Sequence, residues 1–276
     1  MSLVLQTNVS SLTAQQNLNT VSKGLAMSFN RLSSGFRINT AADDAAGLAI
    51  SESFKSQIRS YSVAERNAND GVSMAQTGEG ALGQVTGMLA RMRELAVQAS
   101  NGSMSSADRG FLNTEFTQLQ SEIDRIQKST TYDGTSLIQA TTSSVSFQVG
   151  INNATTDQIA VTFGGLTLTT LLAATTAVSG SGATASLKAI DRIDAALTTV
   201  STTRARFGAV MNRFDVTTAN IQTARTNLAA ANSRIRDVDV AEESASLSRS
   251  QVLSQAAAAV LAQANQSPQL ALGLLR

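Results

Sequence analysis

The chain has 276 residues, of which 42% are hydrophobic and 15% charged, and its net charge of +1 excludes a disordered protein of the highly charged, weakly apolar kind. It contains no cysteine and no histidine, which excludes disulfides, thiolate zinc sites and the hydrolase mechanisms that need either residue. The balanced charge also lacks the basic footprint of a nucleic-acid-binding protein.

None of the common catalytic or cofactor motifs occurs in the sequence. There is no Walker-type phosphate loop, no HExxH zinc motif and no paired carboxylate motif. Without histidine or cysteine, only Asp, Glu or Lys chemistry would remain open. We therefore expect a non-enzymatic protein that uses no cofactor or metal and binds no nucleic acid.

The first segment, residues 1–44, is expected to form an amphipathic helix. Residues 1–22 carry no charge, and they lack the basic start and the continuous apolar core of a secretory signal peptide. If the protein leaves the cell, the sequence indicates another exporter. No uncharged stretch is long enough and apolar enough to span a membrane. The apolar stripe at helical spacing consists of Leu18, Val21, Leu25, Phe29 and Leu32.

Residues 45–140 carry two further helical patterns joined by a turn. The Asn101-Gly102 pair favours a turn and ends a helix, so the pattern predicts a helix and a returning, antiparallel helix. Gly71, Gly78 and Gly80 weaken the middle of the first helix, and its continuity there stays open. The periodic positions are Ile50, Phe54, Ile58, Tyr61, Leu82, Val85, Leu89, Met92, Ala96 and Ala99, then Leu112, Phe116, Leu119, Ile123 and Ile126.

Residues 141–185 differ in character from the rest of the chain. Between residues 134 and 187 the only charge is Asp157, while Thr, Ser and Gly are plentiful. Residues 145–149 and 158–163 alternate apolar and polar side chains, which predicts a small β insertion. A flexible Thr/Ser-rich linker is the alternative, because the alternation is short.

Residues 186–236 form the most regular pattern of the chain. Apolar residues recur at a spacing of seven, which is typical of a helix packed along a coiled-coil seam and predicts a rod about 65 Å long. Its partner positions become polar toward the carboxy-terminal side, so we expect fuller packing in the amino-terminal half. The seam residues are Ile193, Val200, Phe207, Phe214, Ile221, Leu228 and Ile235.

The last segment, residues 237–276, resembles the first in its chemistry. Residues 250–275 carry no charge, and this stretch and residues 1–22 each hold six Asn or Gln residues. Uncharged helices with apolar stripes favour burial against other copies of the chain, since amides avoid the desolvation cost of ions. Pairing of the two ends within one monomer is the alternative. The apolar residues in this segment include Ala245, Leu247, Val252, Leu253, Ala259, Val260, Leu261, Leu274 and Leu275.

An ordered set of short motifs resembles bacterial flagellin, the filament subunit of the flagellum. In the first half these motifs include RLSSG at 31–35, DDAAGLAIS at 43–51, RNANDG at 66–71 and RELAVQ at 93–98. In the second half they include NRF at 212–214, SRI at 233–235, LAQANQ at 261–266 and LLR at 274–276. The set covers most of the chain outside the middle, which is short for the family.

The resemblance implies a mainly α fold in which helical arms pair in a polymer. Residues 1–44 and 237–276 would form the inner tube of the filament. Residues 45–140, the small β segment 141–185 and the long helix 186–236 would form the surrounding rod domain. The polymerisation core would then comprise Leu18, Val21, Leu25, Phe29, Leu32, Leu247, Val252, Leu253, Ala259, Val260, Leu261, Leu274 and Leu275.

The resemblance also implies partners and a location. It implies export through the flagellar type III apparatus to the extracellular filament used for motility. The expected partners are other copies of the chain, an export chaperone at the carboxy-terminal arm, and the filament cap and hook–filament junction proteins. A junction protein is the alternative within this class. A protease-bearing flagellin is disfavoured by the short middle, and a membrane-active protein by the scarcity of basic residues in the arms.

The family is finally a ligand of the vertebrate innate receptor, Toll-like receptor five. The resemblance therefore implies a receptor-contact surface formed by Arg91, Glu94, Leu95, Gln98, Glu115 and Ile193. The alternative is that these are ordinary bundle residues, with Arg91 and Glu94 as a surface ion pair.

Overall fold

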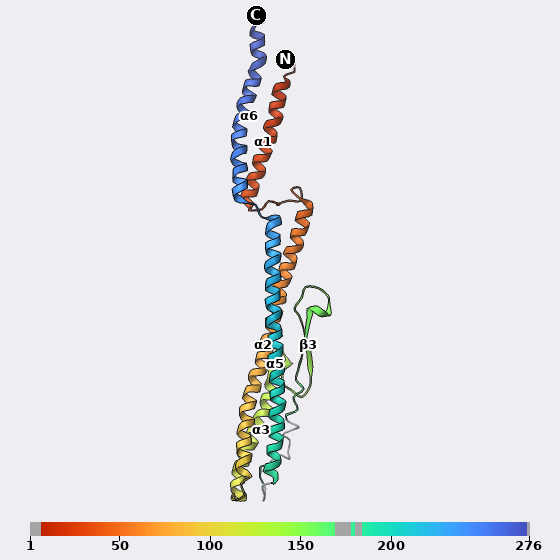
Figure 1. Cartoon of the computed structure of the whole chain (residues 1–276), viewed down its shortest axis with the longest axis vertical. Coiled ribbons are helices and arrows are strands. Elements are labelled where there is room, and N and C mark those ends of the chain that lie inside the picture. The colour runs from red at the N-terminus through yellow and green to blue at the C-terminus, as the bar shows by residue number, and fades with distance from the viewer. Residues whose placement is uncertain (1–6, 169–177, 180–183, 275–276) are drawn as a thin grey trace. The chain divides into compact units, whose positions relative to one another are not determined.

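The computed structural model describes residues 7–168, 178–179 and 184–274, with side chains as far as residue 266 (Figure 1). Long helices dominate and two small antiparallel sheets lie between them, which confirms the predicted mainly α fold with a small β insertion. The chain forms two compact units, residues 1–58 with 226–276 and residues 59–225. The described helices and strands are α1 (Val9–Ser34), α2 (Ala45–Ala99), α3 (Ser106–Ser129), β1 (Thr131–Tyr132), β2 (Thr135–Ser136), β3 (Ser143–Gln148), a 3-10 turn (Thr155–Asp157), β4 (Gln158–Phe163), α5 (Thr184–Arg236) and α6 (Val240–Leu274).

In the first unit, α1 and α6 lie side by side (Figure 1). The Asn8 side chain caps α1 by accepting a hydrogen bond from the Ser11 N–H at 3.1 Å. Gly35 ends the helix at φ 74°, a left-handed conformation in which its N–H donates to the Arg31 carbonyl. The Asp239 carboxylate accepts from the Ala241 N–H at 2.9 Å and so caps the start of α6.

In the second unit, α2 and α5 run antiparallel along a shared apolar seam. Ion pairs across them join Glu65 to Arg225 and Arg93 to Asp194, so the residue numbers rise on one helix as they fall on the other. The helix α2 is continuous through Gly71 and Gly78, which settles the question that the sequence left open.

The turn between α2 and α3 is fixed by polar groups. Ser105 and Asp108 form a capping box at the start of α3, in which each side chain accepts from the other's backbone N–H. The buried Arg109 side chain donates to the carbonyls of Ala99 at 2.9 Å and Asn101 at 3.0 Å. These bonds satisfy carbonyl groups that the end of α2 leaves without helical partners.

The β insertion is an ordered structure through residue 168, so the flexible-linker alternative is wrong for residues 134–168, while residues 169–177 and 180–183 of the same segment lie outside the described residues. The strands β3 and β4 pair antiparallel, with Val145 opposite Val161 and Phe147 opposite Ile159. The strand β4 alternates exposed and buried residues, as the sequence pattern predicts. Asp133 and Gly134 join β1 to β2 with φ values of 45° and 74°, as a two-residue hairpin of the favoured twist requires.

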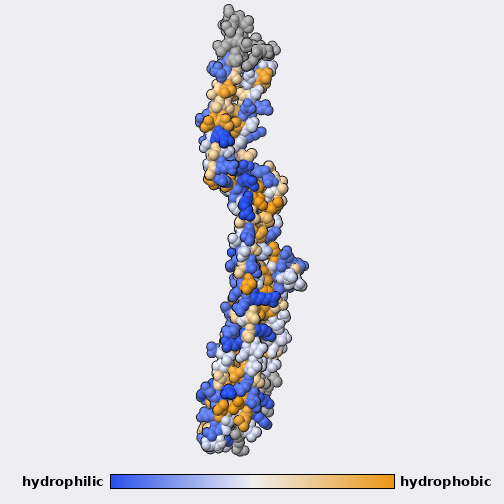
Figure 2. Space-filling view, viewed as in Figure 1, coloured by the Kyte–Doolittle hydropathy of each residue, from blue (hydrophilic) through white to orange (hydrophobic). Residues whose placement is uncertain are grey.

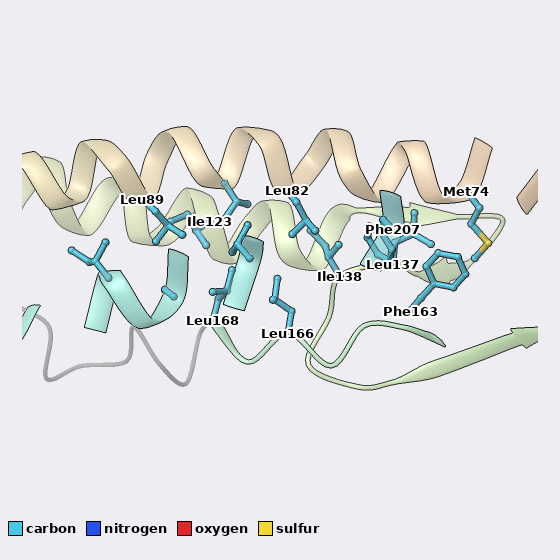
Figure 3. Packing of buried hydrophobic residues seen from close by; sticks show 14 of the residues in the cluster. Met74, Leu82, Leu89, Ile123, Leu137, Ile138, Phe163, Leu166, Leu168 and Phe207 are labelled. Carbon is cyan, nitrogen blue, oxygen red and sulfur yellow. The ribbon is translucent and has the colours of Figure 1, made fainter. Parts of the chain in front are cut away.

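The core of the second unit follows the heptad pattern of α5. Figure 3 shows part of this core, in which Phe207 packs among residues of α2, α3 and the insertion. Leu228 and Ile235 are only half-buried, so the amino-terminal part of the seam is packed more fully, as expected. Leu137, Ile138, Leu166 and Leu168 from the insertion complete this core. The fully packed seam residues are Ile193, Val200, Phe207, Phe214 and Ile221, each at most 4% exposed.

Candidate assembly and receptor surfaces

The predicted polymerisation residues lie on α1 and α6, and within the single chain they are incompletely buried. The exposed fractions are 66% for Phe29, 65% for Val252, 48% for Leu253 and 59% for Val260. Ala259 is also exposed, whereas Leu18, Val21, Leu25, Leu32, Leu247 and Leu261 are half-buried. The side chain of Leu274 and the whole of Leu275 lie outside the described part of the structure.

Four further apolar side chains on these helices are exposed and were missed by the sequence analysis. They fall outside the apolar stripes that the helical spacing indicated, but like the residues of those stripes they leave apolar surface uncovered in the single chain. On the face in Figure 2, hydrophobic patches interrupt the surface of both units. The four residues are Val9, Leu12, Met27 and Val240, whose exposed fractions lie between 46% and 63%.

A groove between α1 and α6 shows where the pair leaves apolar surface open. It has a volume of about 250 Å³, and Val21, Leu253 and Val260 line it together with alanines of both helices. Nearer the free ends, Asn8 donates to the Ala264 carbonyl at 2.8 Å and Ser11 donates to the Asn265 side chain at 2.7 Å. The helices therefore associate within the monomer through neutral hydrogen bonds near their free ends and an Arg31–Glu243 ion pair at 3.6 Å near the other end, while apolar faces remain uncovered.

The two connections that lead into α1 and α6 are fastened to each other. The Arg37 N–H donates to the Arg236 carbonyl at 2.7 Å, and the Val238 N–H donates to the Gly35 carbonyl at 3.1 Å. The Arg236 guanidinium lies 4.5 Å from the centre of the Phe36 ring, a cation–π contact. It also donates to Glu52, and this hydrogen bond lowers the pKa of the Glu52 carboxyl.

In the second unit, α2 and α3 present a charged surface that contains four of the predicted receptor residues. The Arg91 guanidinium donates to Glu115 at 2.8 Å and to Glu94 at 2.9 Å. These bonds raise the pKa of Arg91 and lower that of Glu115. Arg91, Glu94, Gln98 and Glu115 are all exposed.

The structure corrects the other two predicted receptor contacts. Leu95 is 1% exposed and Ile193 is 0% exposed, because both belong to the seam between the helices. A buried side chain cannot contact a partner directly, so these two residues can only support the surface above them. An ion pair that the sequence did not indicate lies nearby. Arg93 donates a hydrogen bond to Asp194 at 2.7 Å, although the two residues are 101 positions apart in the chain.

The described residues hold neither a metal-type cluster nor a membrane-spanning helix. No three His, Cys, Asp or Glu side chains of this part of the chain gather as in a metal site. None of the described helices is long and apolar enough to cross a membrane.

A long helical protein whose end helices carry few charges and leave apolar faces uncovered belongs to the class of self-assembling structural proteins. Two family models place it more closely: residues 5–143 match the bacterial flagellin N-terminal helical region, and residues 190–275 match the bacterial flagellin C-terminal helical region. The chain is also 43% identical to a flagellin of Halalkalibacterium halodurans over 99% of its own length and 100% of that protein. The chain therefore belongs to the bacterial flagellin family, and it is a structural subunit of the flagellar filament.

Solved structures agree with this assignment. The crystal structure of Bacillus cereus flagellin is 31% identical, with a TM-score of 0.50 over 60% of this chain and 94% of that one. A putative flagellar hook-associated protein from Vibrio parahaemolyticus has a TM-score of 0.62 over 71% of this chain and 100% of that one. Its identity is only 13%, so this likeness concerns the fold alone and does not favour the junction-protein alternative.

Proposed function

We propose that the uncovered faces of α1 and α6 form the polymerisation core of the filament and that the subunit is exported before it assembles for motility. The observation that carries the proposal is the exposure of Phe29, Val252, Leu253 and Val260 on helices that carry few charges. Residues 1–44 and 237–276 would form the inner tube, and residues 45–140, 141–185 and 186–236 the rod around it.

The driving force is the removal of these faces from water. Each Å² of apolar surface buried contributes about 25 cal/mol, opposed by the entropy of ordering the arms. Asn and Gln side chains can then hydrogen-bond inside the polymer without the desolvation cost of charges. Assembly driven in this way needs no cofactor and no bond cleavage.

Electron microscopy of negatively stained protein tests the polymerisation core. The full chain, seeded or salted out, is compared with a chain that lacks residues 1–40 and 240–276. We expect long tubular filaments from the full chain alone. Filaments from the shortened chain would show that other surfaces drive assembly.

Family membership supports the remaining partners of the proposed function. Export would use the flagellar type III apparatus, with a chaperone on the carboxy-terminal arm formed by α6. The filament cap and hook–filament junction proteins would contact the subunit during assembly and at the filament base. The exposed apolar side chains of Val252, Leu253 and Val260 on α6 support chaperone binding, since such a surface needs cover before it polymerises.

We also propose that the monomer is a ligand of the innate receptor, Toll-like receptor five, through Arg91, Glu94, Gln98 and Glu115. Arg91, Glu94 and Glu115 form one exposed, hydrogen-bonded network on α2 and α3, and Gln98 is exposed one helical turn after Glu94, which supports a preorganised contact. Arg side chains in such networks are frequent binding hot spots.

A pair of matched double variants tests the receptor surface. Arg91→Ala with Glu115→Ala removes the network, while Arg125→Ala with Glu122→Ala removes a similar ion pair on the exposed side of α3. In a receptor reporter assay with monomeric protein, we expect a loss of signalling of at least tenfold for the first variant only. Equal signalling by both variants would contradict the site.

A further inference from the structure

The seam between α2 and α5 contains two layers in which a glycine faces a phenylalanine. An ideal Cβ atom on Gly71 would lie 2.5 Å from Cζ of Phe214, and one on Gly78 would lie 2.8 Å from Cε2 of Phe207. Such distances are too short for any side chain, so each ring occupies space that only glycine leaves free. We call these two layers the glycine sockets.

The β insertion closes each socket from the other side. The Phe147 ring of β3 lies 5.3 Å from the Phe214 ring at an interplanar angle of 87°, an edge-to-face contact. The Phe163 ring of β4 lies 5.7 Å from the Phe207 ring, and Figure 3 shows these two side chains close together. The Asn67 side chain of α2 donates to the Gln148 carbonyl at 2.9 Å, which ties the same hairpin to the helix.

The other apolar layers of the seam distinguish one heptad from the next only weakly. Continuing the spacing of seven from the sockets places Val85 opposite Val200 and Met92 opposite Ile193, all fully buried aliphatic layers. Aliphatic layers of similar volume can exchange partners at small cost. Of the ion pairs along the seam, Arg93–Asp194 is exposed and contributes little, whereas Arg204–Glu79 and Arg225–Glu65 are partly buried and add to the native register.

We propose that the two glycine sockets, together with the β3–β4 hairpin that covers them, lock the antiparallel register of α2 against α5. A slip of one heptad in one direction would bring Phe207 onto Val85, and a slip in the other direction would bring Phe214 onto Ala64. Each slip therefore drives a ring into a side chain. It also places an aliphatic residue over a glycine and leaves a void. The rings of Phe147 and Phe163 in the hairpin contact Phe214 and Phe207, and these contacts form only in the native register.

Cross-linking in the full chain tests the register directly, because the chain has no cysteine of its own. Cysteines replacing Arg93 and Asp194 report the native register, since these side chains touch. Cysteines replacing Arg93 and Ser201, or Arg93 and Leu187, report slips of one heptad in either direction. A short bis-maleimide linker joins only the cysteine pair that lies side by side in a given register, because a slip of one heptad moves a residue by about 10 Å along the helix.

The informative variant replaces both glycines of the sockets and both facing phenylalanines by valine, so that these layers resemble the Val85 layer. We expect the chain with native sockets to cross-link only the native pair. We expect the valine variant, still helical by circular dichroism, to raise the yield of at least one slipped pair tenfold or more. A helical valine variant that cross-links only the native pair would overturn the proposal.

A second measurement decides the matter if the valine variant fails to fold. Phe214→Leu should recover most of the melting temperature lost in Gly71→Ala, whereas Phe207→Leu should recover none of it. Rescue by the wrong partner, or by neither, would show that the sockets do not act as specific pairs.

Discussion

At the scale of single residues, the glycines of α2 differ in what surrounds them. Gly78 faces the Phe207 ring, whereas a Cβ on Gly80 would meet no atom within 4 Å. Gly78→Ala should therefore destabilise the protein by about 1 to 3 kcal/mol through overpacking. Gly80→Ala should stabilise it by about 0.5 to 1 kcal/mol, since alanine loses less entropy in a helix. Urea titration of both variants measures these changes, and the same sign for both would contradict the assignment.

Arg109 is a second residue whose role is local and structural. It is 4% exposed and donates to the Ala99 and Asn101 carbonyls at the α2–α3 turn. Arg109→Met keeps much of the packing and removes the donors, so we expect a loss of about 2 to 3 kcal/mol in the free energy of unfolding. Lys128→Met, an exposed change on the same helix, is the control and should be nearly neutral. Thermal unfolding followed by circular dichroism compares the two.

At the scale of elements, the start of α3 depends on an ionised carboxylate. The hydroxyl and the N–H of Ser105 donate to Asp108, and these bonds lower the pKa of Asp108 below its ordinary 3.8. A lowered folded pKa means that the stabilisation is present above the unfolded pKa and is lost as the pH falls through the folded value. The pKa values of Glu115, Glu122 and Asp194 are lowered by their arginine partners and act in the same direction.

Acidification should accordingly weaken the second unit. We expect the melting temperature to be level near about pH 6 and to fall steadily below about pH 4. Asp108→Asn keeps a hydrogen-bond acceptor and removes the titrating group, so its melting temperature should fall less over the same range. Calorimetry of both proteins across this range measures the slopes. An equal fall in both would mean that other carboxylates carry the dependence.

The elements show how far sequence reasoning reaches and where it stops. The seam of α5 and the alternation of β4 are local periodicities, and the sequence predicts both because burial follows the repeat. The glycine sockets require knowledge of the register between two helices, which no local pattern contains. The same reason explains why Leu95 and Ile193 match the family's receptor motif and yet lie in the core. It also explains why the Arg93–Asp194 pair went unnoticed.

At the scale of the whole molecule, assembly should be sensitive to charge on the α6 face. Leu253 is 48% exposed and lines the groove between α1 and α6. Leu253→Asp would bury a carboxylate in the polymer, at a cost that we expect to abolish filaments while the monomer keeps its helical content. The control Leu253→Asn introduces a side chain with the shape of aspartate but without its charge. It should retain partial assembly, because neutral amides already occur in both arms. Filament yield measured by sedimentation distinguishes the two variants. Normal filaments from Leu253→Asp would show that this face of α6 is not buried in the polymer.

The uncovered end helices also predict how protease acts on the free and assembled subunit. In the monomer, few polar contacts join α1 to α6, and the groove between them is partly open. The pair should therefore open more readily than the seam of the second unit, whose core is packed by the glycine sockets and the β3–β4 hairpin. Limited digestion of monomer should therefore remove about the first forty and the last forty residues and stop within the rod. In filaments the peptide bonds cleaved in the monomer should resist the protease, because assembly covers α1 and α6. Mass spectrometry of the fragments from both states measures the difference. Equal resistance would mean that the ends are as stable alone as in the polymer, and burial between subunits would then not be what orders them.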